Sequence, residues 1–219
     1  MDRGNKKSFA RFVSFEGIDG CGKSTQMLHF GHGLDKAGIA YIPTREPGAT
    51  VLGASLRKML LDPSFSGMDH WAELLLYLAD RAQHVAEVIR PALEQGLWVL
   101  SDRYADATLA YQGAARGLDM ERLKTLHEWT TGNLWPDATV LLDCDVDTAH
   151  ERRSGRSGAP DRLELQKRDF HERVRKGYLD LAASEPERFF VLDASRSVQE
   201  TAEELRELFR QRLGMELPA

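Results

Sequence analysis

The chain has 219 residues, of which 42% are hydrophobic and 29% charged, and its net charge is −5. This composition predicts one soluble globular domain over residues 1–219. The negative charge argues against nucleic acid as a partner, and no apolar run approaches the ~18 residues of a membrane span. Two cysteines without a C-x-x-C pair argue against a disulfide framework or zinc site, so we expect a cytoplasmic protein.

Residues 1–10 carry charges without a following apolar segment, so we expect a flexible tail rather than a secretion signal. The first predicted strand is residues 12–15, an apolar run rich in β-forming residues. A glycine-rich segment follows, and then a predicted helix over residues 23–37, which Gly38 ends.

The segment 17–24 reads GIDGCGKS and fills every fixed position of the phosphate-binding motif G-x-x-x-x-G-K-[ST]. Its glycines let backbone N–H groups turn toward phosphate oxygens, and the helix N-terminus adds partial positive charge. We expect Lys23 to reach the β- and γ-phosphates and Ser24 to bind Mg²⁺. The alternatives are an ordinary glycine turn and, for Cys21, a reactive thiol instead of a small packing residue. The predicted ATP-binding residues are Gly17, Ile18, Asp19, Gly20, Cys21, Gly22, Lys23, Ser24 and Thr25.

The second predicted strand, residues 39–43, runs into a charged turn at residues 44–48. Ligands of open α/β sheets lie at the carboxyl ends of strands, so this turn is a candidate site. The alternative is a solvated ion pair in a Pro-Gly turn. A helix is predicted over residues 51–61. Its inward-facing residues are expected to be Leu52, Leu56 and Leu60.

A long helix is predicted over residues 69–94, with a kink or boundary near Pro91. Tyr77 and Arg81 are four residues apart and are therefore neighbours on one face of this helix. They are either a ligand-binding pair or a core tyrosine beside a surface arginine.

Residues 97–100 form a continuous apolar run, as expected of a central parallel strand. Asp102 and Arg103 follow at its carboxyl end. Asp102 is suited to hold Mg²⁺ directly or through water, and Arg103 to bind phosphate. The alternative is an ion pair at a strand end.

The C-terminal half continues the alternation of strands and helices. Residues 152–163 combine small residues, glycines and arginines, which indicates a mobile basic lid or, alternatively, a solvated loop. The whole pattern predicts an α/β fold, with a five-stranded parallel sheet flanked by helices on both faces. The remaining predicted elements are helix 120–131, strand 139–143, a short helix capped by Asp147, helix 163–184, strand 189–193 and helix 198–213.

These segments together resemble the thymidylate kinase family of nucleoside monophosphate kinases, over nearly the whole chain. The resemblance implies a P-loop NTPase fold with a small arginine-bearing lid, and a homodimer. It implies Mg²⁺-assisted phosphorylation of dTMP to dTDP with ATP as donor. It rests on residues 15–26, 44–48 (TREPG), 102–104 (DRY), 110–113 (AYQG) and the arginines before residues 161–162.

Two other functions compete with this interpretation. The nearest is another nucleoside monophosphate or nucleoside kinase of the same fold. The other is a nucleotide switch such as a GTPase, which is disfavoured because the guanine motif N-K-x-D is absent.

The resemblance also implies roles at matching positions. Asp19 would approach the 3′-hydroxyl of the acceptor sugar, and Tyr111 would crowd its 2′ position. Tyr77, where the family usually has phenylalanine, would stack on thymine, and Arg81 would bind the base edge. The other arginines would hold the phosphate, and two polar residues would contact the pyrimidine. The full acceptor set is Arg45, Glu46, Pro47, Arg57, Tyr77, Arg81, Arg103, Thr108, Tyr111 and Gln112.

Two positions depart from the family pattern. Ala49 replaces a glycine, so the local backbone is expected to differ slightly. Gly20 stands where some members have an arginine, which implies that the catalytic arginine comes from the lid. Arg153 is the first candidate and Arg156 the second, with Arg152 as an alternative. The expected catalytic residues are Lys23, Asp19, Arg103, Arg153 and Arg156, and the expected metal ligands are Ser24 and Asp102.

Overall fold

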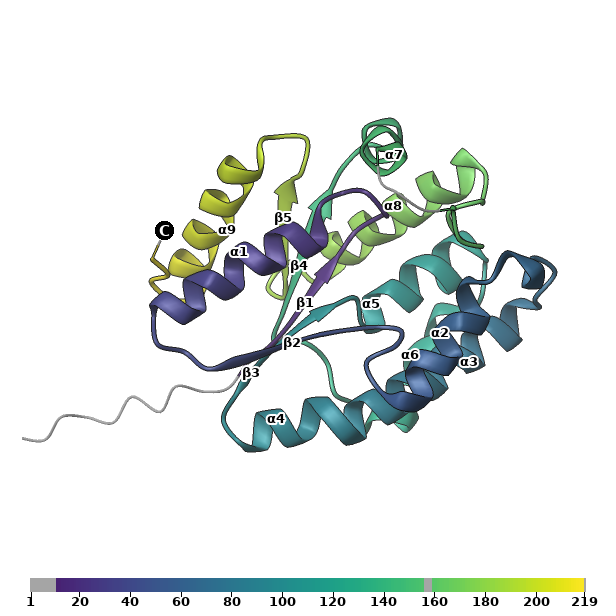
Figure 1. Cartoon of the computed structure of the whole chain (residues 1–219), viewed down its shortest axis with the longest axis horizontal. Helices are drawn as coiled ribbons and strands as arrows, with labels where there is room; N and C mark the ends of the chain where they lie inside the picture. The colour runs from purple at the N-terminus through teal and green to yellow at the C-terminus, as the bar shows by residue number, and fades with distance from the viewer. Residues whose placement is uncertain (1–10, 156–158, 219) are drawn as a thin grey trace, which may run out of the picture.

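The computed structural model describes residues 11–155 and 159–218, so the predicted tail at residues 1–10 lies outside the described residues. Within them, five parallel strands form one sheet in the order β2-β3-β1-β4-β5 (Figure 1), which confirms the predicted fold class. The winding reverses at β1, which has β3 on one side and β4 on the other. The strands are β1 Phe12–Glu16, β2 Tyr41–Arg45, β3 Trp98–Asp102, β4 Ala138–Asp143 and β5 Phe189–Asp193.

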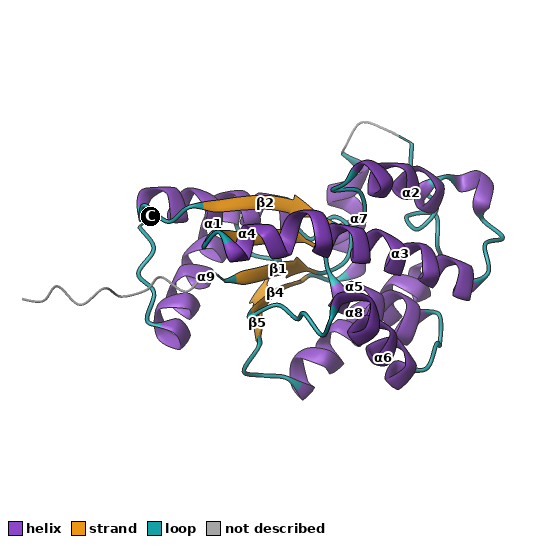
Figure 2. Ribbon diagram, turned by 90° about the horizontal axis from the view of Figure 1, so that it is seen from below, coloured by secondary structure: helices purple, strands orange, loops and turns teal. Residues whose placement is uncertain are grey.

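Helices cover both faces of this sheet (Figures 1 and 2). They are α1 Lys23–Lys36, α2 Val51–Leu61, α3 His70–His84, α4 Arg90–Glu94, α5 Ala105–Thr108, α6 Met120–Thr131, α7 Val146–Ser154, α8 Arg168–Ser184 and α9 Val198–Leu213, with the shorter segments η1 Pro63–Phe65, η2 Val85–Ile89 and η3 Leu109–Ala115. No helix among the described residues is long and apolar enough to cross a lipid bilayer.

The side chains of β1 alternate between two packed layers. Val13 and Phe15 belong to the cluster that includes Phe30 of α1 and Phe209 of α9, whose ring centroids lie 4.5 Å apart. Phe12 faces the other way, into the cluster formed with η2 and α4. The strand is therefore buried on both faces, as a central parallel strand must be, with Ser14 and Glu16 as buried polar residues on the face of Phe12.

The helix predicted over residues 69–94 is interrupted by the π-helical turn η2 just before Pro91. Proline has no N–H to donate, and its ring collides with the carbonyl four residues earlier in a regular helix. A wider turn relieves that collision, so the predicted boundary near Pro91 is confirmed. The sequence offers no comparable signal for the second π-helical turn, η3.

The inward face of α2 differs from the prediction. Leu52 is 46% exposed, and Gly53 takes its place beside Leu56 and Leu60. A Cβ at Gly53 would lie 2.3 Å from Asp80 Oδ1 of α3, which is closer than two such atoms can approach. Glycine at position 53 therefore lets α2 and α3 pack closer together than any larger residue would.

Local hydrogen bonding shifts three other predicted boundaries. Strand β2 ends at Arg45, two residues later than predicted, because it pairs with β3 up to that point. Asp145 rather than Asp147 caps α7, since its carboxylate accepts the first-turn N–H. Helix α8 begins at Arg168, five residues later than predicted, after a separate turn. The other predicted strands and helices are confirmed within one or two residues.

Candidate active site

The phosphate loop connects β1 to α1 at the carboxyl edge of the sheet. Gly17 and Gly22 have φ angles of +135° and +99°, a region that side chains with a Cβ rarely adopt. The Lys23 ammonium group folds back over the loop and donates to the carbonyl oxygens of Gly17 and Ile18, both at 3.1 Å. Loop and lysine thus converge on one point, which suits an anionic ligand.

Gly20 explains how α7 packs onto this loop. A Cβ at Gly20, whose φ is +96°, would lie 2.1 Å from the carbonyl oxygen of Ala149 in α7. An arginine here would therefore require α7 to move. The glycine links the phosphate loop to the helix that carries Arg152 and Arg153.

The Cys21 side chain packs inside the phosphate loop. Its side chain is buried, and its Sγ would lie 2.8 Å from a Cβ at Gly17. Burial raises the pKa of the thiol, although the charge of Lys23 opposes the rise. Thiol reactivity requires the thiolate, so these surroundings favour the small packing residue over the reactive thiol.

Two oxygen donors meet beside the loop, at the start of α1 and the end of β3. Ser24 Oγ donates to Asp102 Oδ2 at 2.8 Å. No group of three or more metal-ligating side chains occurs among the described residues. A Mg²⁺ ion that is shared with phosphates takes only one or two protein oxygens and several waters. The Ser24–Asp102 pair therefore fits such an ion.

Arg103 connects the loop to the helices that follow β3. Its Nη2 donates to Asp19 Oδ1 at 2.7 Å and to the Tyr111 hydroxyl at 3.1 Å. Its Nη1 donates to Gly17 O at 3.0 Å and to the Tyr178 hydroxyl at 3.1 Å. The φ angle of Arg103 is +72°, which is uncommon for a residue with a side chain. Such conformations persist where surrounding contacts over-determine them, as these four hydrogen bonds do.

Asp19 is held as a carboxylate in this arrangement. Burial alone would raise its pKa, but the charges of Arg103 and Lys23 lower the pKa of Asp19 well below its usual value. A charged oxygen beside the loop is therefore available to accept a hydrogen bond from a ligand hydroxyl.

One cavity collects nearly all of the predicted acceptor residues. Arg45 is the exception, since it is exposed and does not line the cavity. The predicted residues that do line it are Asp19, Glu46, Pro47, Arg57, Tyr77, Arg81, Arg103, Thr108, Tyr111 and Gln112. The sequence did not indicate five further lining residues, which are Leu61, Tyr104, Ala107, Asp161 and Leu163.

Only Tyr104, inside the DRY motif, carried a signal that could have pointed to the cavity. The others are apolar or lie in loops, where nothing in the local pattern distinguishes a lining residue from a surface one. Their placement follows from the packing of α2, α5 and the turn before α8 around one space.

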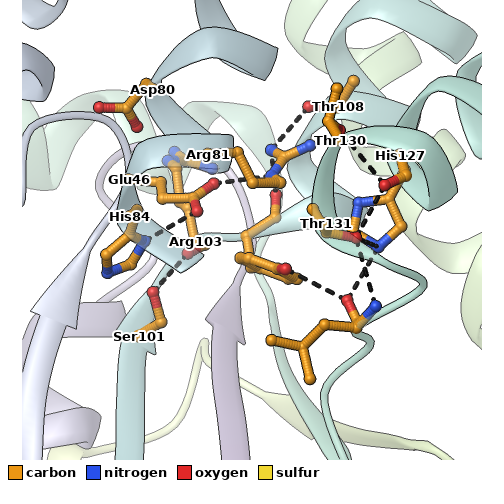
Figure 3. Close-up of polar contacts among 12 residues, drawn as sticks. Glu46, Asp80, Arg81, His84, Ser101, Arg103, Thr108, His127, Thr130 and Thr131 are labelled. Atoms are coloured by element: carbon orange, nitrogen blue, oxygen red, sulfur yellow. Dashed lines mark hydrogen bonds and ion pairs between the residues drawn. The ribbon is translucent and has the colours of Figure 1, made fainter. Parts of the chain in front are cut away.

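Arg81 is buried, with 2% of its side chain exposed, so the alternative of a surface arginine is wrong. Its Nε donates to Glu46 Oε2 at 2.9 Å, and its Nη2 donates to Thr108 Oγ1 and Tyr104 O (Figure 3). Its Nη1 has no hydrogen-bond partner within the described part of the chain. A buried donor without a partner is costly, and a ligand oxygen in the cavity would satisfy it.

A second group of hydrogen bonds holds Glu46 from behind. Glu46 Oε1 lies 2.8 Å from His84 Nδ1, and His84 Nε2 lies 2.7 Å from Thr44 Oγ1. Nearby, Asp80 accepts from Gly48 N at 3.0 Å (Figure 3 shows Asp80 near Glu46). Burial and the charge of Glu46 raise the pKa of Asp80 to about 6. Within the charged turn that the sequence indicated, Glu46 is therefore buried and hydrogen-bonded to α3, whereas Arg45 is exposed.

The two arginines of α7 that the sequence singled out, Arg152 and Arg153, line different pockets that both border the phosphate loop. Arg152 donates to Ala194 O at 2.6 Å and lines a pocket with Cys21 and Thr25. Arg153 lines a different pocket, next to Asp19. The second candidate, Arg156, lies outside the described residues.

Arg162, near the C-terminal end of the basic segment 152–163, is buried rather than exposed. Its Nε donates to Leu60 O at 2.7 Å, and its Nη1 donates to Glu73 Oε2 at 2.6 Å. The C-terminal end of the segment predicted as a lid is thus anchored to α2 and α3.

Comparison with known proteins agrees with this architecture. The family model for thymidylate kinase matches residues 15–205. The thymidylate kinase of Symbiobacterium thermophilum is 48% identical, over 90% of this chain and 91% of its own. That of Desulfovibrio desulfuricans is 52% identical over 84% and 88%, and that of Solidesulfovibrio magneticus 50% identical over 88% and 95%. The chain belongs to the thymidylate kinase family of phosphotransferases.

Proposed function

We propose that the chain transfers the γ-phosphoryl group of ATP to dTMP, forming dTDP and ADP. The observation that carries this proposal is the cavity beside the phosphate loop, which unites Tyr77, Arg81, Gln112 and Tyr111 in a member of this family. The base would lie against Tyr77 with an oxygen at Arg81 Nη1. The sugar would lie near Asp19 and Tyr111, and the phosphate near Arg57 and Arg103.

The two pockets on either side of the phosphate loop support distinct places for donor and acceptor. The acceptor cavity shares Asp19 with the loop. The other pocket combines loop residues with Arg152 and the start of α9. The nucleoside of ATP fits this second pocket, since its phosphates would then run along the loop toward the acceptor.

The acceptor oxygen belongs to a phosphate that is already ionised, so transfer needs no strong base. Catalysis is then positioning and stabilisation of charge. Lys23 and Arg153 are the cations placed to neutralise charge on the transferring group. Ser24 and Asp102 would hold Mg²⁺, which supplies further neutralisation of the phosphates when bound.

The segment predicted as a lid, residues 152–163, would close over both nucleotides. It extends from the end of α7, which rests on Gly20, to the anchored Arg162. Closure would bring Arg153, or Arg156 as the second candidate, to the phosphates and exclude water from them. In this proposal the lid and the sheet belong to one domain.

A homodimer is the proposed assembly. Exposed apolar side chains occur on both α2 and α3, two helices that contact each other. Exposed apolar side chains on neighbouring helices supply the kind of surface that an interface between copies of the chain would bury. A second copy of the chain would cover Val51, Leu52, Met59, Trp71 and Leu75.

The test is an acceptor panel with ATP and Mg²⁺, comparing dTMP, dUMP, dCMP, UMP and AMP. We expect dTMP to have the highest kcat/KM and ATP turnover to require an acceptor. Preference for another monophosphate would favour a different kinase of the same fold, and turnover without an acceptor would contradict phosphoryl transfer to a nucleotide.

A further inference from the structure

Glu73 of α3 lies behind the acceptor cavity, fully buried, at the centre of three side-chain contacts. Its Oε1 accepts from Gln112 Nε2 at 2.8 Å. Its Oε2 accepts from Arg162 Nη1 at 2.6 Å and from Arg116 Nη2 at 3.2 Å. Burial opposes ionisation, but these partners lower the pKa of Glu73 below its usual value. The carboxylate is therefore charged and can only accept hydrogen bonds.

An acceptor-only partner decides how the Gln112 amide is turned. The NH₂ group of Gln112 must face Glu73, because two acceptors would repel each other. The amide oxygen then points away from Glu73. Gln112 lines the cavity, and within residues 11–155 and 159–218 its Oε1 accepts no hydrogen bond. Gln112 thus offers the cavity an acceptor.

Arg81 offers the complementary group to the same cavity. Its Nε and Nη2 are held by Glu46, Tyr104 and Thr108, which leaves Nη1 as a buried donor without a partner in the described residues. Thymine and uracil present an acceptor, O4, next to a donor, N3–H. Cytosine presents a donor, its 4-amino group, next to an acceptor, N3. The donor of Arg81 and the acceptor of Gln112 match the first pattern.

We propose that Glu73 is a specificity-determining positioning residue, which orients the Gln112 amide so that the cavity selects thymine or uracil over cytosine. This inference rests on the proposed function, because it concerns the same acceptor cavity. Arg162 shares the carboxylate with Gln112, so the anchor of the predicted lid and base recognition meet at one residue.

The decisive variant is Glu73→Gln, assayed with ATP and Mg²⁺ against dTMP and dCMP. Its neutral amide can donate or accept, so Gln112 is free to turn. We expect the ratio of kcat/KM for dTMP to that for dCMP to fall about tenfold, as for a lost hydrogen bond in a polar site. The KM for dTMP should rise while the KM for ATP stays unchanged. Glu73→Asp keeps an acceptor-only group and should retain most of the ratio.

The matched control is Glu121→Gln, the same change at a glutamate that is 83% exposed on α6. It should keep the wild-type ratio. A folded Glu73→Gln protein, with thermal unfolding like the wild type, that also keeps the ratio would overturn the inference. A wild type that does not prefer dTMP in the acceptor panel would instead contradict the proposed function.

A measurement on the wild type decides the matter if Glu73→Gln does not fold. In the complex with dTMP labelled with ¹⁵N at N3, the N3–H proton should exchange slowly with water, because Gln112 Oε1 accepts it. Exchange at the rate of the free nucleotide would mean that no acceptor faces N3, and the inference would be wrong.

Discussion

The arginine at the base end of the proposed active site is fixed more firmly than the arginine at the lid end. At the base end, the Arg81–Glu46 ion pair is buried, with a distance of 2.9 Å. At the lid end, Arg153 is partly exposed, lies 4.0 Å from Glu164, and has its Nη2 2.8 Å from Nδ1 of the exposed His150, a neighbour on its own helix. Recognition thus uses groups that are ordered before the ligand arrives, which avoids an ordering cost on binding. The loosely held arginine is free to be recruited when the phosphates come together.

The largest effect should come from the loosely held end. In Arg153→Lys, we expect kcat to fall about 10³-fold, because lysine cannot bond two phosphate oxygens as a planar guanidinium does. The KM values for dTMP and ATP should change only a few-fold, since the charge that Arg153 meets develops during transfer. Steady-state kinetics on purified variants provide the measurement.

Arg152→Lys is the natural control for that experiment, because Arg152 faces the other pocket. It should affect the KM for ATP more than kcat. If Arg152→Lys loses kcat and Arg153→Lys does not, the assignment of the two arginines is reversed. If neither does, Arg156→Lys tests the remaining candidate.

Lys23→Ala should have the next largest effect, a loss of about 10²–10³ in kcat, as for other preorganised charge stabilisers. The fold should remain intact, since the loop conformation depends on its glycines. Kinetics and thermal unfolding of the same sample check both parts. A near-normal kcat would remove the phosphate loop from the proposed mechanism.

Arg81→Lys should show the opposite kinetic signature to Arg153→Lys. The lysine can still pair with Glu46 but loses the donor directed at the base, so we expect the KM for dTMP to rise about tenfold with kcat little changed. The KM for ATP should not move, and Arg122→Lys on the exposed surface of α6 should change nothing. A rise in the KM for ATP alone would contradict the placement of the base.

The smallest effect concerns Asp80, which lies near Glu46. The pKa of Asp80 is raised from 3.8 to about 6 by burial and by the charge of Glu46. A raised native pKa stabilises the fold below pH 4, and this contribution is lost as the pH rises through 6. Asp80→Asn should therefore be more stable than the wild type above pH 7, by about 1–3 kcal/mol.

The measurement is urea unfolding of wild type and Asp80→Asn at pH 4.5 and pH 8. Asparagine keeps an oxygen for Gly48 N, so the difference should shrink at the lower pH. A difference that is equal at both values would show that Asp80 is not the titrating group.

The elements that depend on neighbouring residues in the chain could be predicted from the sequence. The phosphate loop could be predicted because its four fixed positions lie within eight consecutive residues, with a predicted strand just before them and a predicted helix starting at their end. The helix boundary near Pro91 could be predicted for the same reason, because proline disrupts the hydrogen bonding of the helix that contains it. By contrast, Leu52 was misplaced because the buried face of α2 depends on Gly53 meeting Asp80 of another helix.

The sequence by itself determined that a nucleotide-binding loop sits in an α/β sheet, and its motifs indicated which residues surround it. Only the tertiary structure decided which of those residues share a cavity and what each one faces. Arg152 and Arg153 are neighbours in the chain, yet they line different pockets beside the loop. Adjacent residues on a helix point about 100° apart, so contact depends on what packs around the helix. Glu73 stayed unnoticed in the sequence, because its role depends on Gln112, 39 residues away.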